Sequence, residues 1–467
     1  MSHQFDPTVL REYDIRGIIG ETLGADDARA IGRGFATLLR QAGGRTVAVG
    51  YDGRVSSPIL EHALVEGLNA CGCDVVRIGM AATPMLYYAE ASDDQIDGGI
   101  EITGSHNPAN YNGFKLVFQG RPFFGADITR LGERAAAGEW IDGNGTSESR
   151  EVMPAYIDRL LAGLDGADPA ALAGMRIGWD AGNGAAGPAL EQLAARLPGE
   201  HHLLYTAVDG NFPNHHPDPT VEANLEDLRA LVAAKGLDFG IAFDGDGDRI
   251  GAIDGEGRVI WGDQLLMIYA EDALSRHRGA TVIADVKASR ALFDHVAQCG
   301  GVPLMWKTGH SLIKSKMKET GSPLAGEMSG HVLFADDYYG YDDALYAGVR
   351  LMAASARLGR SVTQLRGAMP AMINTPEMRF QVDESRKFAA IDEVKARLAD
   401  STAEVNATDG VRVTSADGWW LLRASNTQDV LVARAESDSQ QGLDRLLAQI
   451  DEQLALSGLE RGASVGH

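Results

Sequence analysis

The sequence has few cysteines and no long apolar run. Its three cysteines, Cys71, Cys73 and Cys299, cannot build a disulfide framework, and Cys71-Gly72-Cys73 lacks the second ligand pair of a zinc site. No stretch approaches the roughly 18 apolar residues of a membrane-spanning helix. The N-terminus shows no basic region followed by an apolar one, unlike a signal peptide. These absences exclude disulfide-rich and membrane classes, so we expect a cytoplasmic protein without a membrane partner.

Basic residues are also scarce. The 467-residue chain has 42 lysines and arginines against 65 aspartates and glutamates, which gives a formal net charge of −23. Nucleic-acid binding needs a basic face, so no nucleic-acid partner is predicted. An anionic ligand would require a local basic pocket. At roughly 150 residues per domain, the length indicates about three or four domains of a soluble enzyme or binding protein.

What the sequence does contain is a threefold repeat. Three β-branched stretches, at residues 46–54, 176–184 and 281–289, each predict a buried strand that opens into a loop and then a helix. A second strand is predicted after each helix, and then a third: residues 74–79 and 98–102, 202–205 and 238–243, 302–306 and 323–326. Strands that alternate with helices predict βαβ units and mostly parallel sheets. The first 365 or so residues are therefore predicted to form three related α/β domains.

The pattern changes from about Met369. Strands are predicted at residues 378–382, 418–423 and 430–433, with helices at 384–399 and 439–456. This order predicts a small α+β domain with an antiparallel sheet.

A polar, glycine-rich loop follows each third strand of the repeat. These loops are Thr103-Gly104-Ser105-His106-Asn107-Pro108, Asp244-Gly245-Asp246-Gly247-Asp248-Arg249 and Glu327-Met328-Ser329-Gly330-His331. In open α/β sheets, ligands bind outside the carboxyl ends of the strands. Three equivalent loops therefore predict one shared site where three domains converge.

The second loop predicts a metal site. Alternating Asp244, Asp246 and Asp248 can point three oxygens at one centre, which suits Mg²⁺ or Ca²⁺. An EF-hand would need glycine at the sixth position and glutamate at the twelfth, where this chain has Arg249 and Gly255. The alternative is a solvated acidic turn, although three carboxylates after an apolar strand would repel one another without a cation.

Two further loops predict phosphate chemistry. Ser105 stands at a strand end between Gly104 and Pro108, exposed for nucleophilic attack, with Lys115 close enough in sequence to stabilise a phosphoryl group or move a proton. In the last domain, Arg423-Ala424-Ser425-Asn426-Thr427 offers a guanidinium and small polar groups to a phosphate. Taken alone, each loop is equally compatible with a polar turn.

Two other patterns resemble known binding motifs, but a structural role is favoured for each. Gly182-Asn183-Gly184-Ala185-Ala186-Gly187 matches a dinucleotide-binding fingerprint, but no acidic residue ends the next strand, so a glycine-rich packing turn is favoured. His215-His216 resembles a metal pair. Adjacent side chains usually diverge, however, and the neighbouring prolines favour a structured loop.

Together these motifs resemble the α-D-phosphohexomutase family, and within it the bacterial phosphomannomutase/phosphoglucomutase branch. The resemblance covers nearly the whole chain and also includes Tyr13-Asp14-Ile15-Arg16-Gly17. It implies three related α/β domains with mixed, mostly parallel sheets and a C-terminal α+β domain around a central cleft. The expected boundaries are residues 1–150, 151–253, 254–367 and 368–467.

The resemblance also implies an isomerase that interconverts hexose 1-phosphates and 6-phosphates of mannose and glucose. Ser105 would carry a phosphoryl group, a hexose 1,6-bisphosphate would be both intermediate and activator, and the substrate would be a phosphosugar. Mg²⁺ would be held by Asp244, Asp246, Asp248 and a Ser105 phosphate oxygen. The oligomeric state stays open, with a monomer as one option.

The family's site residues carry over to matching positions. Catalytic roles are implied for Arg16, Ser105, His106, Lys115, His310 and His331. The general acid and base stay open among Lys115, His310 and His331. Substrate contacts are implied for Tyr13, Arg249, Lys287, Glu327, Ser329, Arg423, Ser425, Asn426 and Thr427, with Glu327 and Ser329 on the sugar and the last four on the non-reacting phosphate.

Two alternatives remain at this stage. Phosphoglucosamine mutase shares the layout but usually has glutamine where this chain has Met328, which favours hexose phosphates. A non-catalytic Mg²⁺-dependent sugar-phosphate binding protein would not need the intact Ser105 and aspartate triad. One departure from the family is that Gln428-Asp429 follows Thr427 where a proline is common. The Asp429 carboxylate either weakens phosphate binding or points away.

Overall fold

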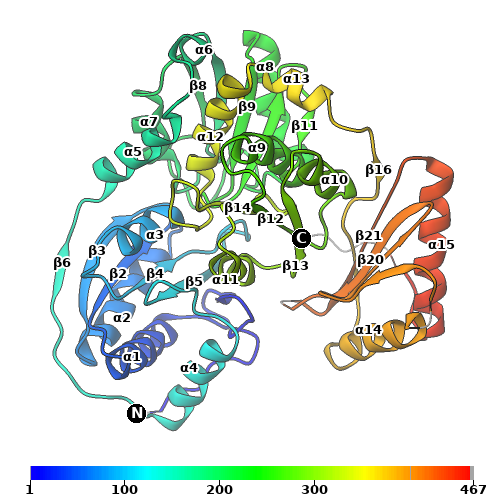
Figure 1. The fold of residues 1–467 in the computed structure, drawn as a ribbon. Helices are drawn as coiled ribbons and strands as arrows, with labels where there is room; N and C mark the ends of the chain where they lie inside the picture. The colour runs from blue at the N-terminus through cyan, green and yellow to red at the C-terminus, as the bar shows by residue number, and fades with distance from the viewer. Residues whose placement is uncertain (1, 400, 427, 463–467) are drawn as a thin grey trace.

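The strands of four β-sheets follow one another along the chain, so that each sheet and its helices form a separate unit (Figure 1). The computed structural model describes residues 2–399, 401–426 and 428–462. We refer to the N-terminal unit (residues 15–149), the second unit (153–260), the third unit (262–367) and the C-terminal unit (373–456). The domain boundaries predicted from the sequence stay a prediction.

The N-terminal unit has strands β1 (Ile15–Ile18), β2 (Thr46–Tyr51), β3 (Asp74–Met80), β4 (Gly98–Ile102), β5 (Tyr111–Phe118) and β6 (Ser147–Ser149), and helices α1 (Ala25–Gln41), α2 (Ser57–Ala70), α3 (Thr83–Ala91) and α4 (Ala126–Ala137). The second unit has strands β7 (Arg176–Asp180), β8 (Glu200–Leu204), β9 (Phe239–Phe243), β10 (Ile250–Asp254) and β11 (Val259–Ile260), helices α5 (Met153–Leu161), α6 (Pro169–Ala173), α7 (Gly187–Ala194) and α8 (Glu226–Lys235), and 3-10 turns at Ala162–Leu164 and Glu222–Leu225.

The third unit has strands β12 (Thr281–Asp285), β13 (Val302–Trp306), β14 (Leu324–Gly326) and β15 (Val332–Phe334), and helices α9 (Gly262–Arg276), α10 (Arg290–Gln298), α11 (His310–Thr320), α12 (Ala344–Leu358) and α13 (Val362–Gly367). The C-terminal unit has strands β16 (Ile373–Asn374), β17 (Met378–Gln381), β18 (Glu404–Asn406), β19 (Val411–Ser415), β20 (Gly418–Ala424) and β21 (Val430–Ser437), and helices α14 (Glu384–Leu398) and α15 (Gln440–Leu456).

The first three sheets repeat one topology. In each, the first strand of the repeat lies between the second and the third, in the orders β4-β2-β3, β9-β7-β8 and β14-β12-β13, and all these pairs are parallel. An antiparallel strand, β5, β10 or β15, then pairs with the third strand. This mixed, mostly parallel arrangement confirms the predicted fold class and brings the three loops to equivalent strand ends.

The central strands of these sheets are buried on both faces. All residues of β4, β9 and β14 are buried, as expected for short apolar strands covered by helices. In the C-terminal unit, by contrast, the ladders of β16 to β21 are all antiparallel. The predicted change of architecture near residue 369 is confirmed.

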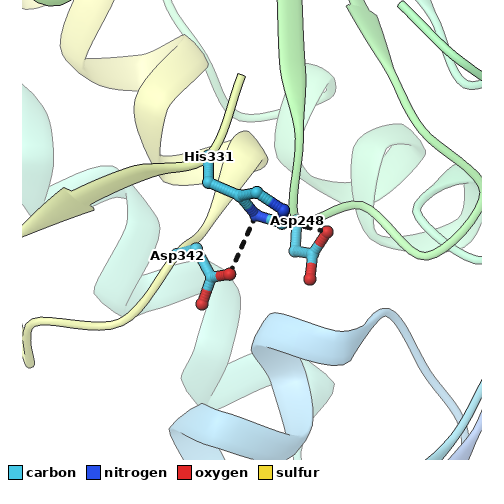
Figure 2. A group of neighbouring side chains, drawn as sticks. All are labelled: Asp248, His331 and Asp342. Atoms are coloured by element: carbon cyan, nitrogen blue, oxygen red, sulfur yellow. Dashed lines mark ion pairs between the residues drawn. The ribbon is translucent and has the colours of Figure 1, made fainter. Parts of the chain in front are cut away.

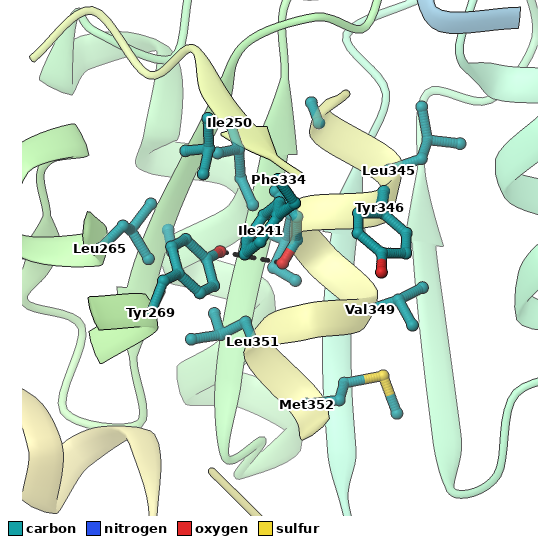
Figure 3. Close-up of a cluster of buried hydrophobic side chains, with 14 of the residues drawn as sticks. Ile241, Ile250, Leu265, Tyr269, Phe334, Leu345, Tyr346, Val349, Leu351 and Met352 are labelled. Carbon is teal, nitrogen blue, oxygen red and sulfur yellow. Dashed lines mark hydrogen bonds between the residues drawn. The ribbon is translucent and has the colours of Figure 1, made fainter. Parts of the chain in front are cut away.

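A continuous hydrophobic cluster joins the second and third units (Figure 3). Ile241 on β9 and Ile250 on β10 pack in the same cluster as Leu265 and Tyr269 on α9 and as side chains of α12. The Tyr269 hydroxyl donates to the Ala347 carbonyl oxygen, 2.9 Å away. These two units are therefore fixed to each other by a shared core, whereas the N-terminal and C-terminal units have their own main clusters.

The cysteines and the apolar character of the helices were the subject of two sequence predictions. Cys71, Cys73 and Cys299 are free thiols, the first two of them buried. Among the described residues, no helix combines the length and the apolar character that a membrane crossing needs.

Candidate active site

Residues of all four units line one cleft of about 680 Å³. Its walls carry eight lysine and arginine side chains but only three acidic ones, although the whole chain has a net charge of −23. The basic residues are Arg11, Arg16, Lys115, Arg249, Lys287, Arg379, Arg423 and Arg434. The structure thus places a local basic pocket in an acidic protein, the arrangement that an anionic ligand requires.

The serine loop follows β4 and holds Ser105 in a strained conformation. Ser105 has φ = 48°, in the left-handed region that non-glycine residues seldom occupy. It is 2% exposed, so it is buried in the cleft wall rather than exposed as the sequence predicts. Its Oγ donates to Asp244 Oδ2, 2.9 Å away, and lies 3.1 Å from His106 Nδ1. The loop therefore presents the serine hydroxyl directly to the aspartate loop of the second unit.

Arg54 holds the serine loop through hydrogen bonds to its backbone, a role that the sequence analysis missed. Its buried guanidinium donates to the carbonyl oxygens of Ser105 at 2.8 Å, Asn107 at 2.6 Å and Pro108 at 2.5 Å. Asp52 accepts from the Arg54 guanidinium and, at 3.0 Å, from the Gly104 backbone N–H. Because these hydrogen bonds involve charged groups, they hold the strained loop firmly.

The three aspartates lie together after β9, fully buried. One ligand oxygen from each of Asp244, Asp246 and Asp248 lies within 4.8 Å of the others. Among the described residues, Asp246 Oδ1 and Asp248 Oδ1 have no hydrogen-bond partner. Burial and then repulsion from the other two carboxylates raise the pKa of Asp244 well above its usual range. Orphaned, hard oxygen donors of this kind fit a divalent cation such as Mg²⁺.

Lys115 supplies the positive charge nearest to these carboxylates. Its Nζ donates to Asp246 Oδ2 at 2.7 Å and forms a second ion pair with Asp248. Although burial acts to lower it, the pKa of Lys115 is raised by these aspartates, so the ammonium form is favoured. Thr83 donates to the same Asp246 oxygen at 2.5 Å, which links the N-terminal and second units at the metal loop.

Two stacked histidines lie beside the aspartates. The rings of His310 and His331 are 5.0 Å apart and nearly parallel. The Nδ1 atoms of His310 and His331 lie 3.1 Å and 2.9 Å from Asp342 Oδ2, and His331 Nδ1 lies 3.7 Å from Asp248 Oδ1 (Figure 2). Arg249 Nε donates to His331 Nε2 at 3.1 Å, so Nδ1 of that ring carries the proton that faces Asp342.

Asp342 is another residue that the sequence analysis missed. It is fully buried, and Lys314 Nζ lies 2.5 Å from its second oxygen. Burial lowers the pKa of the neighbouring His310. The sequence shows Asp342 only as one of two adjacent acids before a helix, so no local signal separates it from Asp343, which caps α12.

The loop that follows β14, residues 327–331, contains a buried carboxylate. Glu327 is 3% exposed, and its Oε1 accepts from the Gly309 backbone N–H at 2.7 Å. Ser329 is half-buried and lines the same cleft. Lys287 Nζ lies 3.0 Å from Glu377 Oε2. These residues place a carboxylate, a hydroxyl and an ammonium on the third unit's side of the cleft.

The C-terminal unit contributes the loop between β20 and β21. Arg423 is buried, and its Nε donates to Asp409 Oδ2 at 3.0 Å. Ser425 Oγ accepts from the Gln428 backbone N–H at 3.2 Å. Asn426 Nδ2 donates to the Tyr13 hydroxyl at 2.6 Å, and that hydroxyl donates to the Thr308 carbonyl oxygen. Thr427, predicted to belong to this loop, lies outside the described residues.

Tyr13 joins this loop to the N-terminal part of the chain, and Arg16 lies nearby against the serine loop. Burial raises the pKa of Tyr13 to about 12, so its hydroxyl stays a hydrogen-bond donor. Arg16 Nη1 donates to Asn107 Oδ1 of the serine loop at 2.5 Å and pairs with Asp14. The structure thus brings all the predicted site residues that it describes to the cleft or directly behind it.

Three further sequence patterns, at Asp429, Gly184 and His215-His216, have a clear position in the structure. Asp429 is 55% exposed and faces Lys387, 3.9 Å away, so its carboxylate points away from the cleft. A Cβ on Gly184 would lie 2.7 Å from the Gly245 carbonyl oxygen, which fits a packing turn against the metal loop. His215 pairs with Asp180, whereas His216 lines the cleft, so the adjacent histidines diverge as predicted.

Comparisons with known proteins match the whole architecture. Family models described as phosphoglucomutase/phosphomannomutase, alpha/beta/alpha domains I, II and III, match residues 7–141, 154–257 and 261–372, and the model of the C-terminal domain matches residues 377–453.

Named relatives cover nearly the full length of the chain. A phosphomannomutase/phosphoglucomutase of Pseudomonas aeruginosa is 44% identical over 96% of this chain and 95% of that protein. A phosphoglucomutase of Neisseria gonorrhoeae is 40% identical over 94% and 95%. The crystal structure of a phosphoglucomutase/phosphomannomutase family protein from Burkholderia thailandensis, 42% identical, superposes with a TM-score of 0.91 over 99% of this chain and 100% of that one.

Proposed function

Because the chain belongs to the phosphoglucomutase/phosphomannomutase family, we propose that it interconverts the 1-phosphates and 6-phosphates of glucose and mannose. One observation carries this proposal beyond the family: a cleft with eight basic and three acidic side chains ends at a buried serine hydroxyl next to three buried carboxylates. The basic walls suit a doubly charged phosphosugar, and the serine offers an acceptor for a phosphoryl group.

In the proposed reaction, Ser105 carries the phosphoryl group in the resting enzyme. A free hydroxyl of the bound hexose monophosphate attacks phosphorus, the bond from phosphorus to Ser105 Oγ breaks, and a hexose 1,6-bisphosphate forms. Because the aspartates favour the ammonium form of Lys115, one of the two histidines, His310 or His331, takes the proton of that hydroxyl. After the bisphosphate turns round, its other phosphoryl group returns to Ser105, and the product leaves. A bisphosphate supplied from outside would rephosphorylate Ser105, which accounts for the proposed activation.

The chain's own residues do most of this work by position and charge. Asp244, Asp246, Asp248 and an oxygen on Ser105 would hold Mg²⁺, which supplies charge neutralisation for the transferring phosphoryl group. Arg54 holds the serine loop, and Arg16 hydrogen bonds to Asn107 of that loop. The Asp342 carboxylate lies 2.9 Å from His331 Nδ1 and favours the position of that ring beside the aspartate loop, 3.7 Å from Asp248.

Substrate recognition is assigned to the part of the cleft formed by the third and C-terminal units. We assign the sugar hydroxyls to Glu327 and Ser329, and the non-reacting phosphate to Arg423, Ser425, Asn426 and Thr427. Lys287 adds positive charge to the cleft wall, and Arg249 adds positive charge at the reactive end, where it contacts His331. Since one serine serves both ends of the sugar, the same distal residues must accept the substrate in two opposite orientations.

A coupled assay with purified protein tests the proposal. Mannose 1-phosphate, glucose 1-phosphate and glucosamine 1-phosphate are each offered with Mg²⁺ and a trace of glucose 1,6-bisphosphate, and formation of the 6-phosphate is followed. We expect turnover of the first two at rates well above that of the third. Turnover of glucosamine 1-phosphate alone would assign the chain to the amino-sugar reaction, and binding without turnover of any would assign it to a sugar-phosphate binding protein.

A further inference from the structure

One basic side chain of the active-site cleft has neither a role in the proposed reaction nor an acidic partner. Arg11 lines the cleft and is partly exposed, so a ligand in the cleft can reach it. Its Nε donates to the Thr8 carbonyl oxygen over 3.4 Å, which is long for a hydrogen bond. Among the described residues, its Nη1 and Nη2 atoms take part in no hydrogen bond and no ion pair. Most of the donors of this guanidinium are therefore open to an anion.

The other seven basic side chains of the cleft are already engaged. Arg249 donates to His331. The remaining six each form an ion pair with a carboxylate of the chain, and they are Arg16, Lys115, Lys287, Arg379, Arg423 and Arg434. Within the part of the chain that the structure describes, Arg11 is thus the one basic residue of the cleft that keeps its terminal nitrogens for a ligand.

The charges next to Arg11 leave a positive excess. Asp14 attracts Arg11 and Arg16 repels it, but the Asp14 carboxylate forms its ion pair with Arg16. One carboxylate therefore serves two guanidinium groups. Burial, ahead of these charges, lowers the pKa of Arg11 from its ordinary value, which means that its charged form is incompletely compensated. A phosphate beside Arg11 would supply the missing negative charge and accept its free donors.

Arg11 belongs to a short turn that lies between the two ends of the cleft. The Arg11 backbone N–H donates to the Asp14 carbonyl oxygen at 3.0 Å and closes the turn. Inside the turn, the Tyr13 hydroxyl meets the loop between β20 and β21, which is the proposed site of the non-reacting phosphate. Directly after the turn, Arg16 donates to the serine loop at 2.5 Å. The turn therefore holds Arg11 close to both phosphate positions and commits it to neither.

From this geometry we propose that Arg11 holds one phosphate of the hexose 1,6-bisphosphate while this intermediate turns round in the cleft, an inference that rests on the proposed mutase reaction. Turning takes both phosphates away from their end positions, although the intermediate carries a charge of about −3 to −4 at neutral pH. A guanidinium with open donors between the two ends offers a phosphate a two-point contact during that time. Without Arg11, the bisphosphate escapes into solution more often before its second phosphoryl group reaches Ser105.

The number of turnovers that the protein completes before it loses its phosphoryl group tests this role. The full chain is phosphorylated with glucose 1,6-bisphosphate, freed of the excess, diluted and mixed with glucose 1-phosphate and Mg²⁺. Each escape of the bisphosphate leaves Ser105 without its phosphoryl group, which intact-mass spectrometry detects. The amount of glucose 6-phosphate formed per Ser105 dephosphorylated therefore counts turnovers per escape. We expect Arg11→Ala to lower this ratio at least about tenfold, because a charge-assisted contact to the turning phosphate is lost.

Two further variants separate this role from a structural one. Arg11→Lys keeps the charge but not the two-point contact, and should recover part of the ratio. Arg130→Ala removes an exposed arginine of α4 outside the cleft and should leave the ratio unchanged. A wild-type ratio in Arg11→Ala, whether or not its rate falls, would overturn the role of Arg11 alone. If the phosphorylated wild type formed no glucose 6-phosphate, the mutase proposal would be wrong and this inference with it.

Discussion

The two ends of the active-site cleft are built differently. At the reactive end, side chains from three units touch directly: Ser105 reaches Asp244 at 2.9 Å, and Arg249 of the second unit reaches His331 of the third at 3.1 Å. At the distal end, the loop between β20 and β21 of the C-terminal unit meets the N-terminal part of the chain through the hydrogen bond from Asn426 to Tyr13. The reactive end is closed and buried, whereas the distal end is joined by a few polar contacts.

This difference separates chemistry from recognition. The reactive groups are held in place before any substrate binds, which lowers the reorganisation needed for phosphoryl transfer. The distal loop sits on a unit with its own hydrophobic cluster, and in the proposed reaction it would meet a sugar that presents either phosphate. Changes at the reactive end should therefore abolish turnover, and changes at the distal end should weaken substrate use by graded amounts.

The largest effect is expected at Ser105. Ser105→Ala removes the only group proposed to carry the phosphoryl group, so activity should fall by several orders of magnitude while the fold is kept. Steady-state assays with added glucose 1,6-bisphosphate measure this, with the exposed Ser92→Ala as the matched control. Wild-type turnover in Ser105→Ala would show that no covalent serine intermediate is needed.

Next in size is the loss of the metal. Asp244, Asp246 and Asp248 repel one another when buried, so removal of divalent cations should abolish turnover and added Mg²⁺ should restore it. Asp246→Asn should weaken Mg²⁺ binding, as measured by titration calorimetry, and should raise the Mg²⁺ concentration required for half-maximal rate. Full activity in excess chelator would show that turnover does not require a divalent cation.

A smaller and symmetrical effect is expected at the distal end. Arg423→Ala should lower kcat/KM by about ten- to hundredfold, because a charge-assisted hydrogen bond to phosphate is worth about 1.5–3 kcal/mol. Glucose 1-phosphate and glucose 6-phosphate should suffer by similar factors, and Arg423→Lys should recover part of the loss. A loss confined to one direction would mean that the loop binds only one orientation of the bisphosphate.

The smallest effect is expected where the two ends are joined. Tyr13→Phe keeps the ring but removes the hydroxyl that links Asn426 to the Thr308 carbonyl oxygen. A hydrogen bond of this kind contributes about 0.5–1.5 kcal/mol, so KM should rise by only a few fold. Unchanged kcat with raised KM supports a recognition role, whereas a large fall in kcat would show that the distal end also sets the chemistry.

The contrast between local loops and contacts that cross units explains how much could be predicted from the sequence. Strand ends and their loops are local patterns, so periodicity and spacing indicate the repeat and the aspartate triad, whereas the role of Ser105 rests on the family resemblance. The register of three parallel sheets then places those loops together. Residues that act across units carry no such local signal.

Asp342 and Arg54 show what was missed and why. Asp342 and Asp343 are adjacent acids, yet one faces two histidines of the cleft and the other caps a helix. Arg54 lies shortly after the end of β2, and only the folded structure reveals the four carbonyl oxygens around its guanidinium. Both roles come from long-range packing, which a single sequence does not encode as a pattern.

The central claim, that Ser105 carries the transferred phosphoryl group, is tested most directly by intact-mass spectrometry of the purified protein. After incubation with glucose 1,6-bisphosphate, the protein should be heavier by one phosphoryl group, mapped to Ser105 by peptide analysis, and an excess of glucose 6-phosphate should remove that mass again. Ser105→Ala should show neither change. A protein that turns over substrate without ever gaining this mass, or that gains it at another residue, would contradict the account.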